Sequence, residues 1–119
     1  MKTIRLNAYG IVWTVRLVVS HYVFGGSIAV GVEDWDEELQ CWEPFADLTK
    51  NLDFPLPDPD TAFVKTYGEN SEWAETLIRE TGIAEPVRDT RGNPVIARSG
   101  YVDIPLYKFD REKLKEYTP

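Results

Sequence analysis

Acidic and aromatic side chains that could recognise another protein are concentrated between residues 33 and 60. This segment contains ten Asp and Glu residues against Lys50 alone, a local charge of −9. The candidate contact residues lie at its start: Glu33, Asp34, Trp35, Asp36, Glu37, Glu38 and Trp42. Carboxylates steer a basic protein toward a surface and large aromatic side chains supply contact area. The pattern therefore predicts a surface that binds a basic protein partner.

The same acidic cluster has two other interpretations. It could be a solvated turn that only keeps the protein soluble, because charge clusters in loops usually face water. The alternation of Asp34, Asp36 and Glu38 also matches the start of a calcium loop, which requires Gly at its sixth position and Glu at its twelfth. Here those positions are Leu39 and Phe45, so the sequence predicts no metal site.

Three arginines form a second candidate site. Arg88, Arg91 and Arg98 lie in a stretch rich in Gly and Pro, near Tyr101 and Tyr107. Guanidinium groups bind phosphate in bidentate fashion and stack with aromatic rings, so this stretch could hold a phosphorylated small molecule. The alternative is three solvated arginines on a mobile loop.

The single His and the single Cys offer little for catalysis. His21 and Cys41 could form a thiolate–imidazole pair if their strands were adjacent, but neither stands in a motif that marks an activated residue. They can form neither a disulfide within the chain nor a four-ligand zinc site. The Gly25-Gly26 pair lacks the Lys and the helix of a phosphate loop. We therefore expect no catalytic residue and no cofactor.

The first half of the chain predicts an antiparallel meander. Residues 2–8 and 11–20 alternate apolar and polar side chains and are expected to pair through a tight turn at Tyr9-Gly10. A third strand is expected at 28–33, followed by a polar connection over 34–38 and a fourth strand over 40–48. Pro44 cannot donate a ladder hydrogen bond, which places the fourth strand at a sheet edge or at a bulge.

The second half predicts helices and further strands. Three prolines make 53–60 an extended connection, and 62–66 is expected to be a short strand. A helix is expected over 71–81, capped by Asn70 or Ser71 and ended by Gly82. The stripe Trp73, Leu77 and Ile78 should pack on the strand face that carries Trp13, Val15 and Leu17. After a hairpin-like loop over 86–100 come a strand over 101–109 and a short helix, capped by Asp110 and extending through Tyr117.

The fold class predicted from these elements is α+β. We expect an antiparallel sheet of four to six strands, with one packed amphipathic helix and a short C-terminal helix. The 119 residues form one α+β domain, 1–119, because single domains usually run to this length.

Composition excludes several functional classes. The chain is 43% hydrophobic and 28% charged, with a net charge of −7. A hydrophobic content this high excludes intrinsic disorder, and the negative charge argues against direct nucleic-acid binding and against anionic membranes. The chain has no signal-peptide pattern and no apolar run approaching 18 residues. These observations predict a cytoplasmic protein.

Several stretches carry a family resemblance: Trp42–Leu52, Ala62–Thr66 followed by Asn70 and Trp73–Glu75, Ser99–Phe109, and the strand at Arg16-Leu17. They resemble an uncharacterised domain-of-unknown-function family of small proteins carried by phages and conjugative mobile elements. Family members tend to have Tyr and Val where this chain has Phe45 and Lys50. The resemblance supplies no activity or catalytic residue; it implies a context in which small acidic proteins often block host defences.

Two functions follow as expectations. The first is a non-enzymatic acidic binding protein, such as a counter-defence inhibitor of the anti-CRISPR kind, which occupies a basic surface of a host nucleic-acid-binding defence protein. The second is a small-ligand binder, such as a sponge for nucleotide signals that uses the arginine loop.

Overall fold

The computed structural model describes residues 1–52, 54, 56 and 58–119. The predicted connection at 53–60 includes Asp53, Pro55 and Pro57, which lie outside the described residues. In chain order the elements are β1 (Ile4–Ala8), β2 (Ile11–His21), β3 (Ile28–Asp36), β4 (Cys41–Asp47), β5 (Thr49–Lys50), β6 (Thr61–Val64), the 3-10 helix η1 (Gly68–Asn70), α1 (Ala74–Thr81), β7 (Ala84–Pro86), β8 (Ile96–Ser99), β9 (Val102–Phe109) and α2 (Arg111–Lys115).

The predicted α+β class is confirmed, with antiparallel strands and a short C-terminal helix. The strands are divided between two sheets, a division that the sequence pattern did not indicate. One sheet has the order β1-β2-β3-β4, and the other has the order β5-β6-β9-β7 with β8 paired to β9. The second sheet forms because β9 pairs with three strands that precede it at different distances along the chain.

The meander of the first sheet follows the predicted order. Tyr9 and Gly10 both have positive φ, 57° and 73°, as a two-residue hairpin turn of the primed type requires. β4 is an edge strand, and it also contains a bulge, because Val32 pairs with Ala46 while Glu33 pairs with Pro44. Pro44 therefore lies where a missing N–H is tolerated.

The predicted polar connection over 34–38 is wrong in its first half. β3 continues through Asp36 and pairs with β4 up to Cys41, so that only residues 37–40 form the turn. Cross-strand pairing overrides the poor strand propensity of the acidic residues here. As a result, the candidate acidic residues acquire strand alternation, which decides where each of them points.

The core lies between the first sheet and α1. Leu17, Trp73 and Leu77 are each at most 1% exposed and belong to one cluster, as predicted. Trp13 is half-buried at the margin of this cluster, where its ring meets Phe45 edge-on with 5.0 Å between centroids. Phe45, the extra residue of the bulge, also meets Trp73 at 5.5 Å. The bulge thus turns an aromatic side chain into the core.

α1 begins three residues later than predicted. Neither Asn70 nor Ser71 caps it: the buried Asn70 side chain donates hydrogen bonds to the carbonyl oxygens of Asp47 and Lys65 instead. Gly82 ends the helix with a φ of 69°, as predicted. The competing hydrogen bonds tie β4 to the segment before α1, and they account for the shift.

The C-terminal helix α2 is capped by the Asp110 side chain, as predicted, but it ends at Lys115. The two residues before Thr118 leave the helix because their carbonyl oxygens accept hydrogen bonds from the strand region: Glu116 from the Lys2 amide and Tyr117 from the Leu17 amide. Tyr117 thereby lies along the edge of β2 beyond the start of β1 at Ile4.

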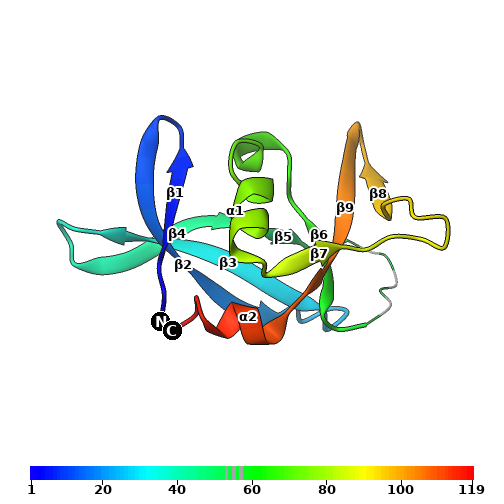
Figure 1. Cartoon of the computed structure of the whole chain (residues 1–119), viewed down its shortest axis with the longest axis horizontal. Coiled ribbons are helices and arrows are strands. Elements are labelled where there is room, and N and C mark those ends of the chain that lie inside the picture. Colours follow the sequence, from blue (N-terminus) through cyan, green and yellow to red (C-terminus); the bar gives the residue numbers. More distant parts are fainter. Residues whose placement is uncertain (53, 55, 57) are drawn as a thin grey trace.

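The described chain is elongated, with extents of 47 × 27 × 24 Å. Figure 1 shows the β3–β4 hairpin at one end of the long axis and the loop between β7 and β8 at the other, with α1 between them. The predicted loop over 86–100 contains β8 and a bridge between Arg88 and Pro94, so it is partly a hairpin. Within the described residues, no helix is both long and apolar enough to cross a membrane.

Candidate protein-binding surface on the four-stranded sheet

Strand register separates the candidate residues onto two sides of the β3–β4 hairpin. We call the side of the first sheet that packs against α1 the inner face and the opposite side the outer face. Trp35 pairs with Trp42, whereas Asp34 pairs with Glu43. Asp34 also pairs with the buried Val15 on β2, which places the acidic pair on the inner side. Trp35 and Trp42 therefore lie on the outer face, because neighbouring residues of a strand point in opposite directions.

The outer face of the hairpin carries an aromatic platform. The Trp35 and Trp42 rings meet edge-on, with 5.3 Å between centroids. The Arg16 guanidinium lies 4.5 Å from the centre of the Trp42 ring, and its Nε donates to Glu33 Oε1 at 2.8 Å. Both charged side chains are largely covered, at 20% and 26% exposure. Glu33 thus fixes Arg16 on the ring, and the four side chains form one rigid unit.

The other side of the hairpin is acidic. Asp34 faces Glu43 directly across the strands, and Asp36 faces Cys41. Like charges directly opposite each other destabilise a strand pair. Partial desolvation, followed by the carboxylates of Glu43, Asp36 and Asp34, raises the pKa of the Cys41 thiol. An acidic environment of this kind keeps the thiol protonated, whereas activated cysteines lie in electropositive surroundings.

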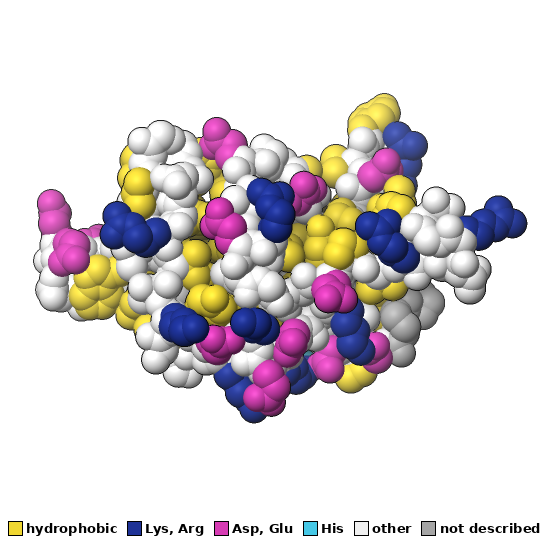
Figure 2. Space-filling view, viewed as in Figure 1, with side chains coloured by type: hydrophobic (Ala, Val, Ile, Leu, Met, Phe, Trp, Pro, Cys, Tyr) yellow, Lys and Arg dark blue, Asp and Glu magenta, His cyan; other side chains and the backbone are white. Residues whose placement is uncertain are grey.

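The turn of the hairpin extends the acidic surface. Asp36 Oδ1 accepts hydrogen bonds from the amides of Glu38 at 2.9 Å and Leu39 at 3.0 Å, so this carboxylate holds the turn in shape. Glu37 and Glu38 are exposed, and Leu39 is 66% exposed. In Figure 2, acidic side chains project from this end of the molecule beside hydrophobic surface. Asp36 is therefore a structural residue, and Glu37 Oε2 accepts a hydrogen bond from Gln40 Nε2 at 3.2 Å, whereas Glu38 and Leu39 are exposed to a partner.

Ion pairs are rarer in the hairpin than in the rest of the described chain, where the carboxylates in no ion pair are Glu72, Glu75, Glu80, Glu85, Asp89 and Asp110. Elsewhere many carboxylates lie within 4 Å of a basic group: Glu116 with Lys2, Glu69 with Lys65, Asp58 with Lys108, and Glu112 with Lys115. Among the described residues, no ion pair involves the hairpin carboxylates other than Glu33: Asp34, Asp36, Glu37, Glu38, Glu43 and Asp47. The negative charge of the hairpin is left uncompensated.

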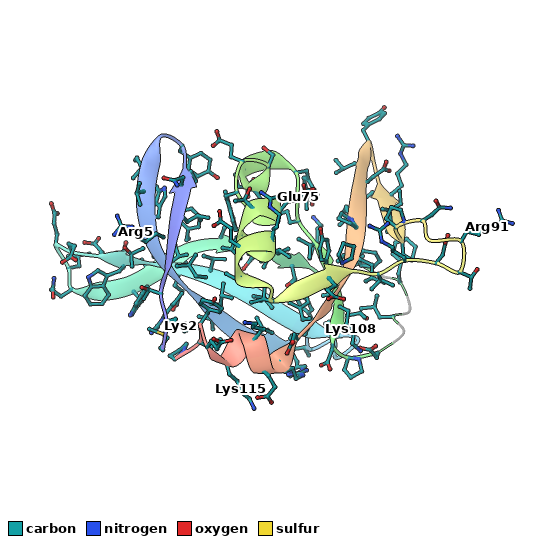
Figure 3. All side chains as sticks on the ribbon, in the orientation of Figure 1. Lys2, Arg5, Glu75, Arg91, Lys108 and Lys115 are labelled. Carbon is teal, nitrogen blue, oxygen red and sulfur yellow. The ribbon has the colours of Figure 1, made fainter. Side chains whose placement is uncertain are left out.

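The three arginines of the second candidate site have separate surroundings. Arg88 Nη1 donates to the Gly92 carbonyl at 3.1 Å, and Arg98 lies 3.8 Å from Asp103 on the neighbouring strand. Arg91 projects from the far tip of the molecule (Figure 3). Tyr101 is 98% exposed at the next turn, whereas Tyr107 is buried. Local carbonyl and carboxylate groups therefore hold two of the three guanidinium groups.

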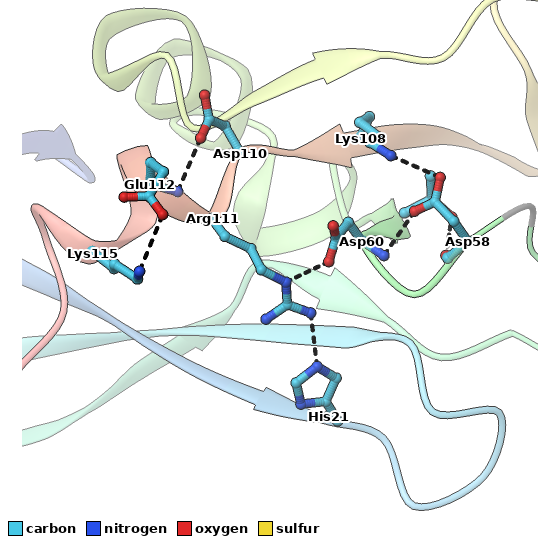
Figure 4. Close-up of polar contacts among 9 residues, drawn as sticks. His21, Asp58, Asp60, Lys108, Asp110, Arg111, Glu112 and Lys115 are labelled. Atoms are coloured by element: carbon cyan, nitrogen blue, oxygen red, sulfur yellow. Dashed lines mark hydrogen bonds and ion pairs between the residues drawn. The ribbon is translucent and has the colours of Figure 1, made fainter.

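His21 and Cys41 are not brought together. His21 pairs with Ile28, the first residue of β3, whereas Cys41 pairs with Asp36, the last residue of β3. His21 Nε2 lies 2.8 Å from Arg111 Nη2, and Arg111 also pairs with Asp60 (Figure 4). These contacts attach α2 to β2 and to the start of β6. No group of three potential metal ligands occurs in the part of the chain that the structure describes.

Two residues of this surface were not singled out from the sequence. Arg16 joins the platform because β2 pairs it with Glu33, and Glu43 joins the acidic side because β4 pairs it with Asp34. For Arg16 a signal existed, since the alternation of β2 already placed it opposite the apolar Val15 and Leu17. The position of Glu43 depends on the bulge, which the sequence predicted only as one of two options.

Comparison with known proteins identifies the family of the chain, although no curated protein or solved structure matches it. None of the curated proteins and none of the solved structures matches the chain significantly. One family model, described as "Domain of unknown function (DUF4313)", matches residues 16–119. The match begins within β2, so it leaves out β1, and it includes the platform and the acidic hairpin. The chain therefore belongs to the DUF4313 family, an uncharacterised family of unknown function.

Proposed function

We propose that this protein is a non-enzymatic binding protein whose β3–β4 hairpin docks on a basic surface of another protein. The observation that carries the proposal is the uncompensated charge of the hairpin, where Asp34 and Glu43 face each other without a cation. A basic side chain placed between them would relieve the repulsion and gain two charge-assisted contacts. The aromatic platform on the opposite side of the same hairpin offers rigid contact area, which dominates interface energy.

The biological setting is part of the proposal and rests on the family resemblance alone. In that setting the gene is carried by a phage or a conjugative element, and the protein acts in the host cytoplasm. The partner would be a nucleic-acid-binding defence protein, because such proteins expose basic surfaces to phosphate backbones. An acidic hairpin would compete with the nucleic acid for that surface, in the manner of an anti-CRISPR inhibitor.

The test uses two triple variants of equal charge. One carries Asp34→Lys, Glu37→Lys and Glu38→Lys, which spares the turn residue Asp36 and places an ammonium group opposite Glu43. The control carries Glu80→Lys, Glu85→Lys and Glu112→Lys, all at exposed positions outside the hairpin. Each set changes three carboxylates to ammonium groups, so the two variants have the same net charge and differ only in where it lies.

The partner is first captured from a bacterial host lysate by the tagged parent protein, identified by mass spectrometry and purified. Association rates are then measured over a range of salt concentrations. We expect the hairpin variant to associate about tenfold or more slowly at low salt, with a flatter salt dependence, and the control to change far less. Equal rates for the two variants would show that the hairpin does not direct binding.

A further inference from the structure

A shallow trough runs along the outer face of the first sheet. It consists of two adjoining hollows of about 280 and 410 Å³, which share Val18, Gly31 and Asp47 in their linings. The first reaches Glu33 and the second reaches Tyr22. The buried residues of α1 and α2 belong to the cluster on the inner face. The two α-helices of the described chain therefore leave the trough open.

Gly31 forms the floor of the trough, although its backbone conformation does not require a glycine. The other seven glycines have positive φ, whereas Gly31 does not. A Cβ atom at Gly31 would meet only Asp47 Oδ1, at 3.9 Å. The nearby bulge does not need a glycine at position 31 either, since its extra residue is Phe45 on β4, and neither residue has a positive φ.

A glycine inside a strand weakens the strand and often marks a place where another backbone approaches closely. Neither the fold nor the packing of this chain explains why position 31 lacks a side chain. A flat floor is explained if a second chain passes over it. The stretch from Ala29 to Trp35 spans about 20 Å at ~3.3 Å per residue, enough for an extended segment of about six residues.

The ends and the margin of the trough indicate which segment would fit. At one end the platform of Trp35 and Trp42 offers an apolar contact. At the other end the Tyr22 hydroxyl and Thr49 Oγ1 form a hydrogen bond of 2.8 Å. At the margin the Asp47 carboxylate is exposed, and no ion pair of the described residues involves it. Since Arg16 already neutralises Glu33, the trough carries a net negative charge.

We propose that the trough binds an extended segment of the basic partner protein, with the segment's backbone crossing Gly31, a Lys or Arg side chain at Asp47 and an apolar side chain against the Trp42 ring. This inference rests on the proposed function and specifies the part of the partner that is recognised. Charge complementarity at Asp47 and the close approach permitted at Gly31 support a peptide segment as the occupant.

The probe for the test is a library of random 12-residue peptides displayed on phage and panned against the parent protein. We expect the enriched peptides to combine a Lys or Arg with an apolar residue. Gly31→Val should weaken their binding at least about tenfold, because its side chain fills the floor. The same variant should unfold at the same or a higher denaturant concentration, because valine favours strands. This separates a blocked trough from a damaged fold.

Two further variants complete the test. Asp47→Asn should weaken binding about threefold to tenfold and reduce its salt dependence. Ser99→Val, at an exposed strand position in the second sheet, is the matched control and should bind the peptides as the parent does. Failure to enrich any peptide, or equal binding by the parent and Gly31→Val, would overturn the trough. The proposed function would survive that result, provided that the hairpin charge reversal still slowed association with the captured partner.

Discussion

The inner and outer faces of the first sheet use the same four strands for different purposes. On the inner face, Val15, Leu17, Val30 and Val32 are at most 2% exposed and pack with α1 and α2. On the outer face the intervening residues form the platform, the glycine floor and the margin at Asp47. Strand alternation makes this division possible, because each residue belongs to one face only. Substitutions of the buried residues that pack under α1 and α2 should therefore change stability, and those in the platform or at Gly31 and Asp47 should change binding.

The largest effect should come from Leu77→Ala on the inner face. Leu77 is fully buried in the cluster that joins α1 to the sheet, so truncation leaves a cavity and should cost about 2–5 kcal/mol of unfolding free energy. Chemical denaturation measures this loss. Glu80→Ala, at an exposed position of the same helix, should change it by less than about 0.5 kcal/mol. A loss under about 0.5 kcal/mol for Leu77→Ala as well would mean that α1 does not dock on the sheet.

Trp35→Ala should produce the largest effect on the outer face. Removing one ring of the platform should raise the dissociation rate of the basic partner by a factor that corresponds to about 2 kcal/mol. Far-UV dichroism and a melting curve establish beforehand that the variant is folded. Tyr101→Ala removes an accessible aromatic side chain at the other end of the molecule, and the rate should then stay unchanged. If both truncations accelerate dissociation equally, the platform has no special role.

Tyr22→Phe should have a smaller effect that depends on pH. Burial raises the pKa of Tyr22, and the hydrogen bond with Thr49 opposes this shift. A raised folded-state pKa gives stability that is present below the unfolded value of about 10 and is lost as pH rises through the folded value. The variant should be about 0.5–1.5 kcal/mol less stable at neutral pH, because the hydrogen bond is gone. Above pH 10 its denaturation curve should approach that of the parent; parallel curves from neutral to alkaline pH would contradict this assignment.

Glu43→Lys should have the smallest effect on stability, and in the stabilising direction. It replaces the repulsion across the strands with an ion pair to Asp34, worth about 0.2–1 kcal/mol. The same change should slow association with the basic partner, because it makes the charge beside the site more positive by two units. Thermal melts and association rates are measured on the same sample. A variant that is both less stable and equally fast to associate would show that the two carboxylates do not face each other.

The meander was predictable from the sequence because its information is local. The alternation in 11–19 identifies the inner face, and Tyr9-Gly10 specifies the turn between adjacent strands. The second sheet was not predictable in the same way. There, β9 pairs with β6 from more than 40 residues away, and hydrophobic periodicity does not indicate which distant strand a strand pairs with. The start of α1 was misplaced because the Asn70 side chain satisfies two distant carbonyl groups instead of a helix end.

The candidate site was predictable in its residue types but not in its geometry. The acids and tryptophans at 33–42 were recognisable as a cluster. Their separation onto two sides depends on β3 continuing through Asp36, which the polar composition of 34–38 argued against. The roles of Gly31 and Asp47 depend on the register between β3 and β4. A cross-strand register of this kind is fixed by the bulge at Phe45 and cannot be read from either strand alone.

Four tryptophans provide the most direct test of the two faces. The indole N–H groups of Trp13 and Trp73 donate to the carbonyl oxygens of Ala8 and Glu69 within the fold, whereas Trp35 and Trp42 form the outer platform. With 5-fluorotryptophan incorporated at all four positions, fluorine NMR gives one signal per tryptophan, assigned by single Trp→Phe variants.

The measurement is a titration of the labelled protein with the purified basic partner. Binding at the hairpin and the trough predicts that the signals of Trp35 and Trp42 shift or broaden first, while those of Trp13 and Trp73 keep their positions. Shifts confined to Trp13 and Trp73, or four unchanged signals at saturation, would contradict the assignment of the outer face as the binding surface.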